Sequence, residues 1–517
     1  MSEPLSDSLK KIGRGTGIAM VGMFAALLLQ FIARLIIARY GLEANYGIFS
    51  LALVILNFAM ILACLGLQEG ATRYIAYFRG KEEAAKVRGT IAVSLELATA
   101  ASIIIAVAIF FSAEVIAVNI FHAPDLAPAL RIFAIAIPFF TLINILAAIF
   151  RGFDKVEPQA YFQYSLFNIL FLSFVLVVAL LDLPFRAIFY AYLAAIVLTF
   201  IALAAYTTKK LPQPITLLDR HANISVRKDL FVFSLPLLGA VMLFMIILWM
   251  DTLMLGYFKM PEVVGLYNAT YPLIYLISAP MATLLLIYTP VATGLYSQNL
   301  MAELRRNYTI LTKWVVSLTL PIFLVLCLFP EAVLNLLFGA GYIAAAPALR
   351  ILSLGFIVNN LFGPNANTLL ALGESRFIMW SVLAAAIMNV LLNIALIPSL
   401  GIVGAAIASA VSLTLSRIIV AVKLYSLCQA QPLSKNLLKP VVVSVALAFL
   451  FQFIVGGFLT VTLWMLPLLF ILYYAIYGTA VVLTRSFDKE DIAMLLEIEK
   501  RSGINAAPIK KILSRFV

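Results

Sequence analysis

The chain has 517 residues, of which 64% are hydrophobic and only 12% are charged, and its mean hydropathy is +1.07. Soluble domains carry about 25% charged residues, so this composition excludes a water-soluble fold and predicts an integral membrane protein. The formal net charge of +12 reflects membrane topology rather than a nucleic-acid partner, because no nucleic-acid-binding motif is present.

Long apolar runs without alternation predict membrane-spanning α-helices, because lipid offers no partners to backbone polar groups and one span takes about 20 residues. The first run follows Lys10, Lys11 and Arg14 and is too long for the apolar core of a signal peptide. The sequence predicts an all-α membrane protein with about fourteen transmembrane helices. In chain order these are 15–40, 45–68, 90–118, 129–150, 160–181, 185–206, 231–257, 265–289, 310–330, 347–372, 378–398, 401–424, 438–460 and 464–484.

A repeated pentapeptide indicates two similar halves in tandem. Residues 128–132 and 347–351 have the same sequence, PALRI, and each copy opens a long apolar run. A second pair of segments, 46–49 and 265–267, gives an offset of 218 residues instead of 219. The repeat predicts the following organisation: a six-helix lobe at 1–206, a cytoplasmic linker at 207–228, a second six-helix lobe at 229–425, an extra helix pair at 436–485 and a cytoplasmic amphipathic tail at 486–517.

The basic residues agree with this order of spans, since Lys and Arg concentrate in cytoplasmic loops. With the N-terminus inside, most of the 36 Lys and Arg residues fall on the cytoplasmic side, and only Arg39, Arg186 and Lys259 fall in outside loops. We therefore expect both termini to be cytoplasmic and the protein to lie in the cell (plasma or inner) membrane.

Motifs of metal, cofactor and hydrolytic sites are missing from the sequence. The chain has 3 cysteines and 2 histidines, without HExxH or CxxC spacing, and we read the cysteines as buried apolar-like side chains. There is no Walker-type glycine loop, no GxSxG motif and no large extramembrane domain. We expect no enzyme, no cofactor and no metal.

Residues 251–267 carry a more specific signal. The segment DTLMLGYF from Asp251 to Phe258, followed by PEVVGLY from Pro261 to Tyr267, resembles the seventh-to-eighth helix signature of the polysaccharide-biosynthesis (O-antigen-type) flippases. Residues 39–49 and 66–75 resemble the first two helices of that family. The resemblance implies the multidrug/oligosaccharidyl-lipid/polysaccharide exporter superfamily, whose members pair two six-helix lobes in a V. The two extra helices resemble those of the lipid II flippase.

The resemblance implies a flippase that moves a polyprenyl-(pyro)phosphate-linked oligosaccharide from the inner to the outer leaflet by alternating access. Membrane lipids, H⁺ or Na⁺, and polysaccharide-assembly proteins are further candidate partners. A cation-coupled multidrug exporter of the same superfamily is the alternative, and it predicts a cavity dominated by acidic and aromatic residues. A membrane glycosyltransferase or ligase would need catalytic residues in a sizeable outer loop, which the sequence lacks. A scaffold subunit would leave Arg34 and Asp251 unexplained.

Arg34 and Asp251 are the main candidates for the substrate site. An anionic head group needs a polar, cationic path across hydrocarbon, and an arginine can hold phosphate with two parallel hydrogen bonds. Arg34 lies roughly 9 Å from the outer end of the first span. It either faces a cavity or extends outward beside Arg39. Asp251 lies at a matching depth in the seventh span, where it would pair with Arg34, bind a coupling H⁺ or Na⁺, or form a structural salt bridge.

Other charged residues are secondary candidates. Arg131 and Arg350 occupy the same place in the repeated pentapeptide, where they would either attract an anionic head group or act as interfacial anchors. Glu96, within the third span, is a second candidate for proton coupling. Glu69 and Arg73 have the i, i+4 spacing of a local surface pair.

Uncharged polar side chains follow two of the later spans. Tyr267, Tyr271 and Tyr275 form one stripe on the eighth span, suited to sugar contact or to packing. Asn365 and its neighbouring asparagines crowd the tenth span, where Pro364 is expected to break the helix, and a proline in the fourth span, Pro138, is a candidate hinge. We expect Arg417, in the twelfth span, to extend to the cytoplasmic surface.

Overall fold

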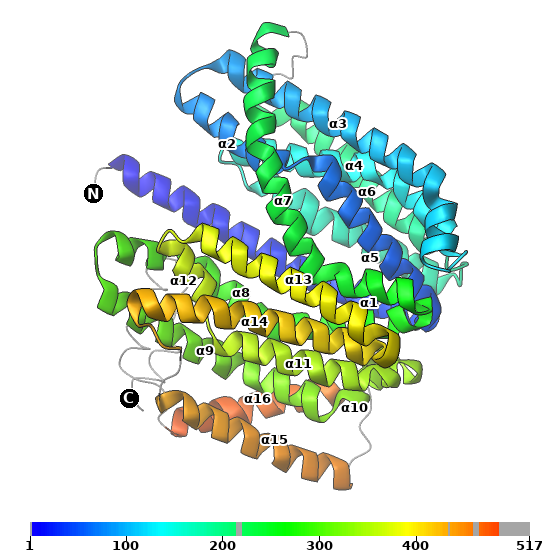
Figure 1. Cartoon of the computed structure of the whole chain (residues 1–517), viewed down its shortest axis with the longest axis vertical. Coiled ribbons are helices and arrows are strands. Elements are labelled where there is room, and N and C mark those ends of the chain that lie inside the picture. The colour runs from blue at the N-terminus through cyan, green and yellow to red at the C-terminus, as the bar shows by residue number, and fades with distance from the viewer. Residues whose placement is uncertain (1–2, 213–219, 433–434, 459–464, 485–517) are drawn as a thin grey trace. The chain divides into compact units, whose positions relative to one another are not determined.

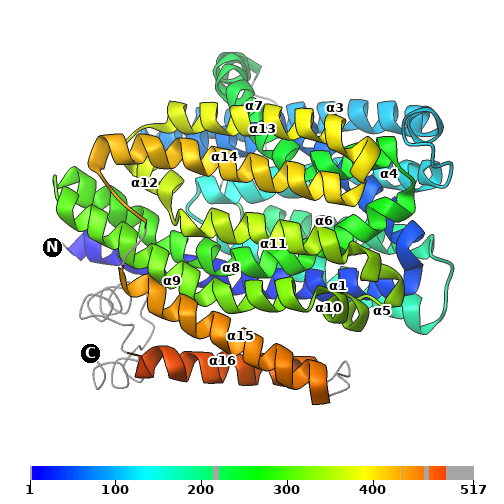
Figure 2. The same cartoon turned by 60° about the horizontal axis from the view of Figure 1, so that its bottom comes forward.

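The structure is a computed structural model that describes residues 3–212, 220–432, 435–458 and 465–484 (Figures 1 and 2). Within these ranges all regular elements are helices. The chain divides into two compact units, residues 1–265 and 266–517. Part of the predicted linker, 213–219, and the predicted amphipathic tail, 486–517, lie outside the described residues.

The spans agree with the hydropathy of the sequence. In the described part of the chain, 11 helices are long and apolar enough to cross a membrane, and two shorter apolar helices follow, α15 (Leu438–Phe458) and α16 (Met465–Leu483). Helix α1 (Glu3–Cys64) bends at Leu42, where φ is 57°, and so contains the first two predicted spans. The prediction of an all-α membrane protein with about fourteen spans is therefore confirmed.

Helix α4 (Leu126–Gly152) forms the core of the first unit. It packs against α1, α2, α3 and α6, and most of its side chains are buried. It continues through Pro138 without ending. Helix α7 joins this unit through contacts with α1, α2 and α3. The other helices of the unit are α2 (Leu67–Gly80), α3 (Ala84–Val115), α5 (Phe167–Leu180), α6 (Ala187–Lys210) and α7 (Arg220–Phe258), with π-helical turns at Ile116–Ile120 and Gln159–Leu166.

The second unit is organised around α11 (Ala346–Leu361), which packs against α9 and α14. The predicted tenth span is broken at residues 362–364, where Gly363 has a φ of +57°. The break expected at Pro364 is therefore confirmed. The remaining helices are α8 (Pro261–Ser297), which crosses the boundary between the units, α9 (Met301–Leu328), α10 (Pro330–Leu337), α12 (Asn365–Ala371), α13 (Ser375–Leu400) and α14 (Ile402–Cys428).

Two glycines make a reciprocal backbone contact between α1 and the first turn of α8. A Cβ atom added to Gly47 would lie 1.7 Å from the carbonyl oxygen of Pro261, and one added to Gly265 would lie 1.9 Å from that of Glu43. Gly47 thus contacts the residue four positions before Gly265, and Gly265 contacts the residue four positions before Gly47. The repeat alignment pairs these same two glycines. We call this contact the glycine crossing, and a residue with a side chain would force the two backbones apart.

Candidate functional site

Arg34 faces polar groups of its own unit. Its guanidinium donates a hydrogen bond to the hydroxyl of Tyr46 and interacts electrostatically with Tyr192. Because α1 bends at Leu42, Tyr46 on the far side of the bend comes back to Arg34. We call Arg34, Tyr46 and Tyr192 the first-unit arginine cluster. Both tyrosines are buried, so Arg34 is directed at buried hydroxyl groups.

Aromatic side chains hold Tyr192 in place. Its ring centroid lies 5.0 Å from that of Phe171 and 5.1 Å from that of Phe133. Phe49 and Phe189 complete the group, with ring centroids 6.0 Å apart. Such rings bury large areas and prefer tilted or edge-on contacts. The cluster therefore rests on a packed aromatic support contributed by α1, α4, α5 and α6.

The two acidic candidates have different surroundings. Asp251 on α7 is fully buried and engages in interactions of its own, and the suggested ion pair with Arg34 stays a prediction. Glu96 on α3 lies 2.9 Å from Arg227 on α7, and both side chains are about half exposed. Exposed pairs of this kind contribute at most about 1 kcal/mol to stability. The coupling roles of Asp251 and Glu96 also stay predictions.

The two arginines of the repeated pentapeptide make the same kind of ion pair. Arg131 lies 3.1 Å from Glu114, at the end of α3, and Arg350 lies 2.8 Å from Glu331 on α10. Arg350 also donates through Nε to the carbonyl oxygen of Cys327, at 3.1 Å. In both cases the glutamate lies in the helix that precedes the arginine's own helix, close to one end of it. This arrangement fits the interfacial-anchor interpretation of both residues, and substrate contact stays a prediction.

The three tyrosines of α8 form the expected stripe. The ring centroids of Tyr267 and Tyr271 are 5.5 Å apart, and those of Tyr271 and Tyr275 are 6.2 Å apart. Tyr267 and Tyr271 are buried, whereas Tyr275 is exposed. Packing accounts for the first two rings, and contact of the stripe with a sugar stays a prediction.

Arg417 joins both sides of the broken helix in the second unit. Its Nε donates to Oδ1 of Asn359 on α11, and its Nη1 donates to Oδ1 of Asn365 on α12, at 3.1 Å. Asn365 in turn donates through Nδ2 to the backbone oxygen of Arg417, at 3.0 Å. We call Arg417, Asn359 and Asn365 the broken-helix cluster. The prediction that Arg417 extends to the cytoplasmic surface is wrong, because these two amides lie within reach and satisfy its donors inside the unit.

In the part of the chain that the structure describes, the charge of Arg417 is met by neutral amide dipoles. Among the described residues, no carboxylate lies within ion-pair distance of its guanidinium, and Tyr308 is the titratable group that interacts with it. Arg417 lies about 16 Å from the C-terminal end of α14, close to the middle of that helix. A charge near the middle of a membrane helix costs about 3 kcal/mol on insertion scales. Such residues usually face a polar partner or a cavity.

Other polar side chains connect the break between α11 and α12 to neighbouring helices by hydrogen bonds. Tyr308 donates its hydroxyl to the carbonyl oxygen of Phe362, at 2.7 Å, and Asn360 donates to that of Ile277, at 3.0 Å. A Cβ atom on Gly363 would lie 1.9 Å from Oγ1 of Thr312. The break is therefore tightly packed: α9 supplies a donor to its Phe362 carbonyl, and its Asn360 side chain in turn donates to a backbone carbonyl of α8.

One sequence-based pairing is wrong. Glu69 pairs with Arg151 on α4, at 3.3 Å, instead of with Arg73. The guanidinium of Arg73 lies over the ring of Phe233, 4.1 Å from its centroid. The i, i+4 spacing does not decide these contacts, because α4 brings a guanidinium to Glu69 and α7 brings an aromatic face to Arg73.

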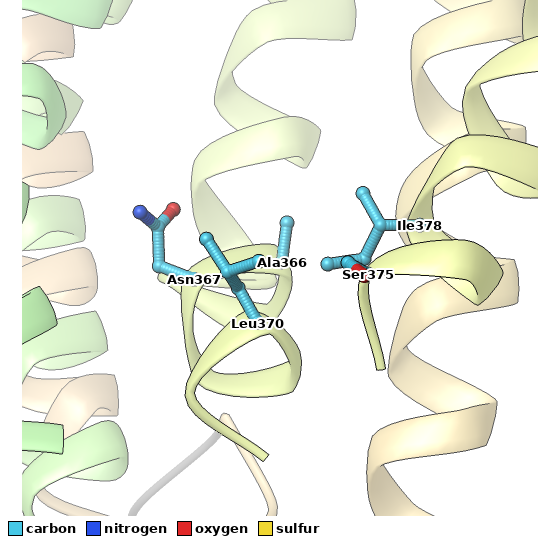
Figure 3. A pocket seen from close by; sticks show the side chains of 5 residues that line it. All are labelled: Ala366, Asn367, Leu370, Ser375 and Ile378. Atoms are coloured by element: carbon cyan, nitrogen blue, oxygen red, sulfur yellow. The ribbon is translucent and has the colours of Figure 1, made fainter. Parts of the chain in front are cut away.

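A pocket of about 160 Å³ lies between the ends of α12 and α13 (Figure 3). Figure 3 shows Ala366, Asn367 and Leu370 on one helix and Ser375 and Ile378 on the next. Pockets for drug-sized ligands measure about 300–1,000 Å³. This pocket is thus too small to hold an oligosaccharide by itself.

The comparisons with known proteins agree with this architecture. A family model described as "Polysaccharide biosynthesis protein" matches residues 12–292. The lipid II flippase MurJ in an inward closed conformation is similar in structure, with a TM-score of 0.68, 14% identity and coverage of 90% of this chain and 97% of that one. An inward-facing multidrug resistance transporter of the MATE family has a TM-score of 0.65, 16% identity and coverage of 78% and 95%.

Two curated relatives have informative names. The teichuronic acid biosynthesis protein TuaB of Bacillus subtilis is 27% identical over 150 residues, which is 29% of this chain and 30% of TuaB. The probable low-salt glycan biosynthesis flippase Agl15 of Haloferax volcanii is 25% identical over 174 residues, 33% of this chain and 36% of Agl15. The chain thus aligns with about a third of the length of the curated relatives that it matches.

Proposed function

Because this chain belongs to the polysaccharide biosynthesis protein family, we propose that it is a flippase for a polyprenyl-(pyro)phosphate-linked oligosaccharide. The substrate would move from the inner to the outer leaflet of the cell membrane. The observation that carries the proposal is Arg34, a cation in a membrane-spanning helix that is directed at buried hydroxyl groups of its own unit. The similarity to Agl15, a probable glycan biosynthesis flippase, and to the lipid II flippase MurJ supports the same class of function.

The physical requirement for such a flippase is a polar path for an anionic head group. Moving a bare phosphate through hydrocarbon is prohibitively costly, and a guanidinium offers paired, charge-assisted hydrogen bonds. In the first-unit arginine cluster, Arg34 would bind phosphate, while Tyr46 and Tyr192 orient its guanidinium. The protein would perform no bond-making chemistry, so no catalytic residue is part of the proposal.

Movement would follow alternating access between two lobes, 1–206 and 229–425, joined by the linker 207–228. The extra helices at 436–485 would contact the lipid tail, and both termini would be cytoplasmic. Asp251 and Glu96 are the proposed sites of H⁺ or Na⁺ coupling. Polysaccharide-assembly proteins are proposed partners.

A cation-coupled multidrug exporter is the second candidate function. The observation in its favour is Asp251, a fully buried carboxylate in a membrane helix, together with the likeness to a MATE-family fold. An exporter of cationic drugs would not use Arg34 for its substrate. The two functions therefore differ in the substrate whose transport requires Arg34: a flippase needs Arg34 to move an anionic lipid-linked oligosaccharide, whereas an exporter of cationic drugs does not need it.

The test follows transbilayer movement in proteoliposomes. Labelled lipid-linked oligosaccharide is placed in one leaflet, and its glycan is detected from the other side with a lectin. We expect the wild-type chain to move it and Arg34→Gln to move it at least about 10-fold more slowly, since one charge-assisted pair is lost. Arg186→Gln is the control, because Arg186 is exposed and only loosely paired with Asp125, at 3.8 Å.

Three outcomes would contradict the proposal. Movement at the rate of protein-free liposomes would exclude the flippase function. Equal rates for Arg34→Gln and Arg186→Gln would remove Arg34 from the path. Transport of a cationic drug that survives Arg34→Gln and is lost in Asp251→Asn would favour the exporter.

A further inference from the structure

The broken-helix cluster has no counterpart in the first half of the chain. The offset of the repeated pentapeptide, 219 residues, pairs Asn359 and Asn365 with Phe140 and Leu146 of α4. Helix α4 is unbroken there, and α6, which corresponds to α14, carries no charged residue before Lys209. The corresponding helices thus fold with no arginine in α6, with no asparagine at these two positions of α4 and without a break. Fold stability alone does not require the cluster.

The chemistry of the cluster fits an anion. Arg417 lies near the middle of a membrane helix, its guanidinium is held by two neutral amide oxygens, and no described carboxylate compensates it. Amide oxygens fix the plane of the guanidinium without neutralising it. An oxyanion would therefore gain a full opposite charge at this position, and the planar fork of arginine matches phosphate geometry.

We propose that the broken-helix cluster is a phosphate-binding position, with Arg417 as the binding residue and Asn359 and Asn365 as positioning residues. It lies in the second unit and is separate from the first-unit arginine cluster. The proposal deepens the proposed function, on which it rests, by assigning a second position for the phosphate of the lipid-linked substrate. Because Arg417 bridges α11 and α12, a bound phosphate would compete with the asparagines and loosen the two half-helices from each other.

The experiment measures binding to the purified full-length chain in micelles. The ligands are polyprenyl phosphate, uncharged polyprenol, inorganic pyrophosphate and phosphatidylglycerol. We expect polyprenyl phosphate to bind more tightly than polyprenol, and Arg417→Gln to weaken it at least about 10-fold. Arg417→Lys should fall between, since lysine keeps the charge without the fork. Arg376→Gln, at an exposed position of the same unit, is the control with the same change of charge.

A second measurement avoids variants that fail to fold. The wild-type chain is treated with the arginine reagent phenylglyoxal, with and without polyprenyl phosphate, and the adducts are located by mass spectrometry. We expect the ligand to protect Arg417 and to leave Arg376 unchanged. Equal labelling of Arg417 in both samples, or no labelling in either, would overturn the proposal.

The ligand series identifies the source of the phosphate. Tighter binding of polyprenyl phosphate supports a lipid-linked source, and equal binding of inorganic pyrophosphate supports a free one. Binding of neither, or a folded Arg417→Gln that binds like the wild type, would overturn the site and reduce Arg417 to a link between helices. If the wild type binds phosphate at Arg417 but flips no lipid-linked oligosaccharide, the proposed function fails and the site stands.

Discussion

Substitution of Gly47 by alanine is the most direct perturbation of the glycine crossing. The new Cβ would lie 1.7 Å from the carbonyl oxygen of Pro261, whereas real Cβ atoms stay at least 3.0 Å from such atoms. The two helices must therefore separate by about 1 Å or more. Overpacking costs typically about 1–3 kcal/mol. We expect the upper end, about 3 kcal/mol, because a backbone carbonyl cannot rotate away as a side chain can.

The assay is denaturant unfolding of the purified chain in micelles, followed by circular dichroism. Gly294→Ala is the matched control: it lies in α8, where an added Cβ meets nothing within 4 Å. Alanine there should be neutral or stabilising by up to about 1 kcal/mol, because it favours helix more than glycine does.

The double variant tests the reciprocity of the crossing. Gly265→Ala alone should cost about as much as Gly47→Ala. Once one alanine has separated the backbones, the second should add little, so the two costs should be far from additive. A Gly47→Ala chain as stable as Gly294→Ala would refute the close contact, and fully additive costs would refute the single shared crossing.

Three further outcomes follow from the structure. Gly363→Ala should destabilise the second unit by about 2 kcal/mol, because its φ is +57° and its Cβ would lie 1.9 Å from Oγ1 of Thr312; stability equal to the Gly373→Ala control, whose φ is +86° but whose surroundings are open, would show that only the backbone angle matters. Glu114→Gln and Glu331→Gln should each cost no more than about 1 kcal/mol, since both ion pairs are partly exposed; a larger loss in thermal unfolding would contradict the anchor interpretation. Phe171→Ala should lower the free energy of unfolding by about 3 kcal/mol and also slow flipping, because the ring centroid of Phe171 lies 5.0 Å from that of Tyr192 and supports it. A destabilised chain with an unchanged flipping rate per folded molecule would show that transport does not depend on the aromatic support.

Hydropathy predicts the spans well because lipid leaves the backbone few alternatives to a helix. The bend of α1 falls between two predicted spans, at polar residues around Leu42, and the break of the tenth span falls at Pro364. Both features have local causes in the sequence, a short polar interruption and a missing N–H group. Local causes are readable without knowledge of the neighbouring helices.

The direction of each side chain is far less predictable. Helix α14 is apolar on all sides, so periodicity does not reveal that Arg417 faces α11 and α12. Glu69 was misassigned for a related reason, since Arg151 lies 82 positions away along the chain. The sequence feature that could have predicted the broken-helix cluster is an arginine within the twelfth span together with several asparagines in the tenth. Asn365 was identified from that crowding, but its partner was not.

The ion pairs of Arg131 and Arg350 have a consequence for how cargo would leave. Both cations stand at helix ends predicted to face outside, and each already has a glutamate 2.8–3.1 Å away. An anion arriving at that surface would meet charges that are largely neutralised, in contrast to the guanidinium of Arg417, which pairs with no described carboxylate. Under the proposed direction of movement, these neutralised arginines would thus favour dissociation of the cargo over its retention at the exit.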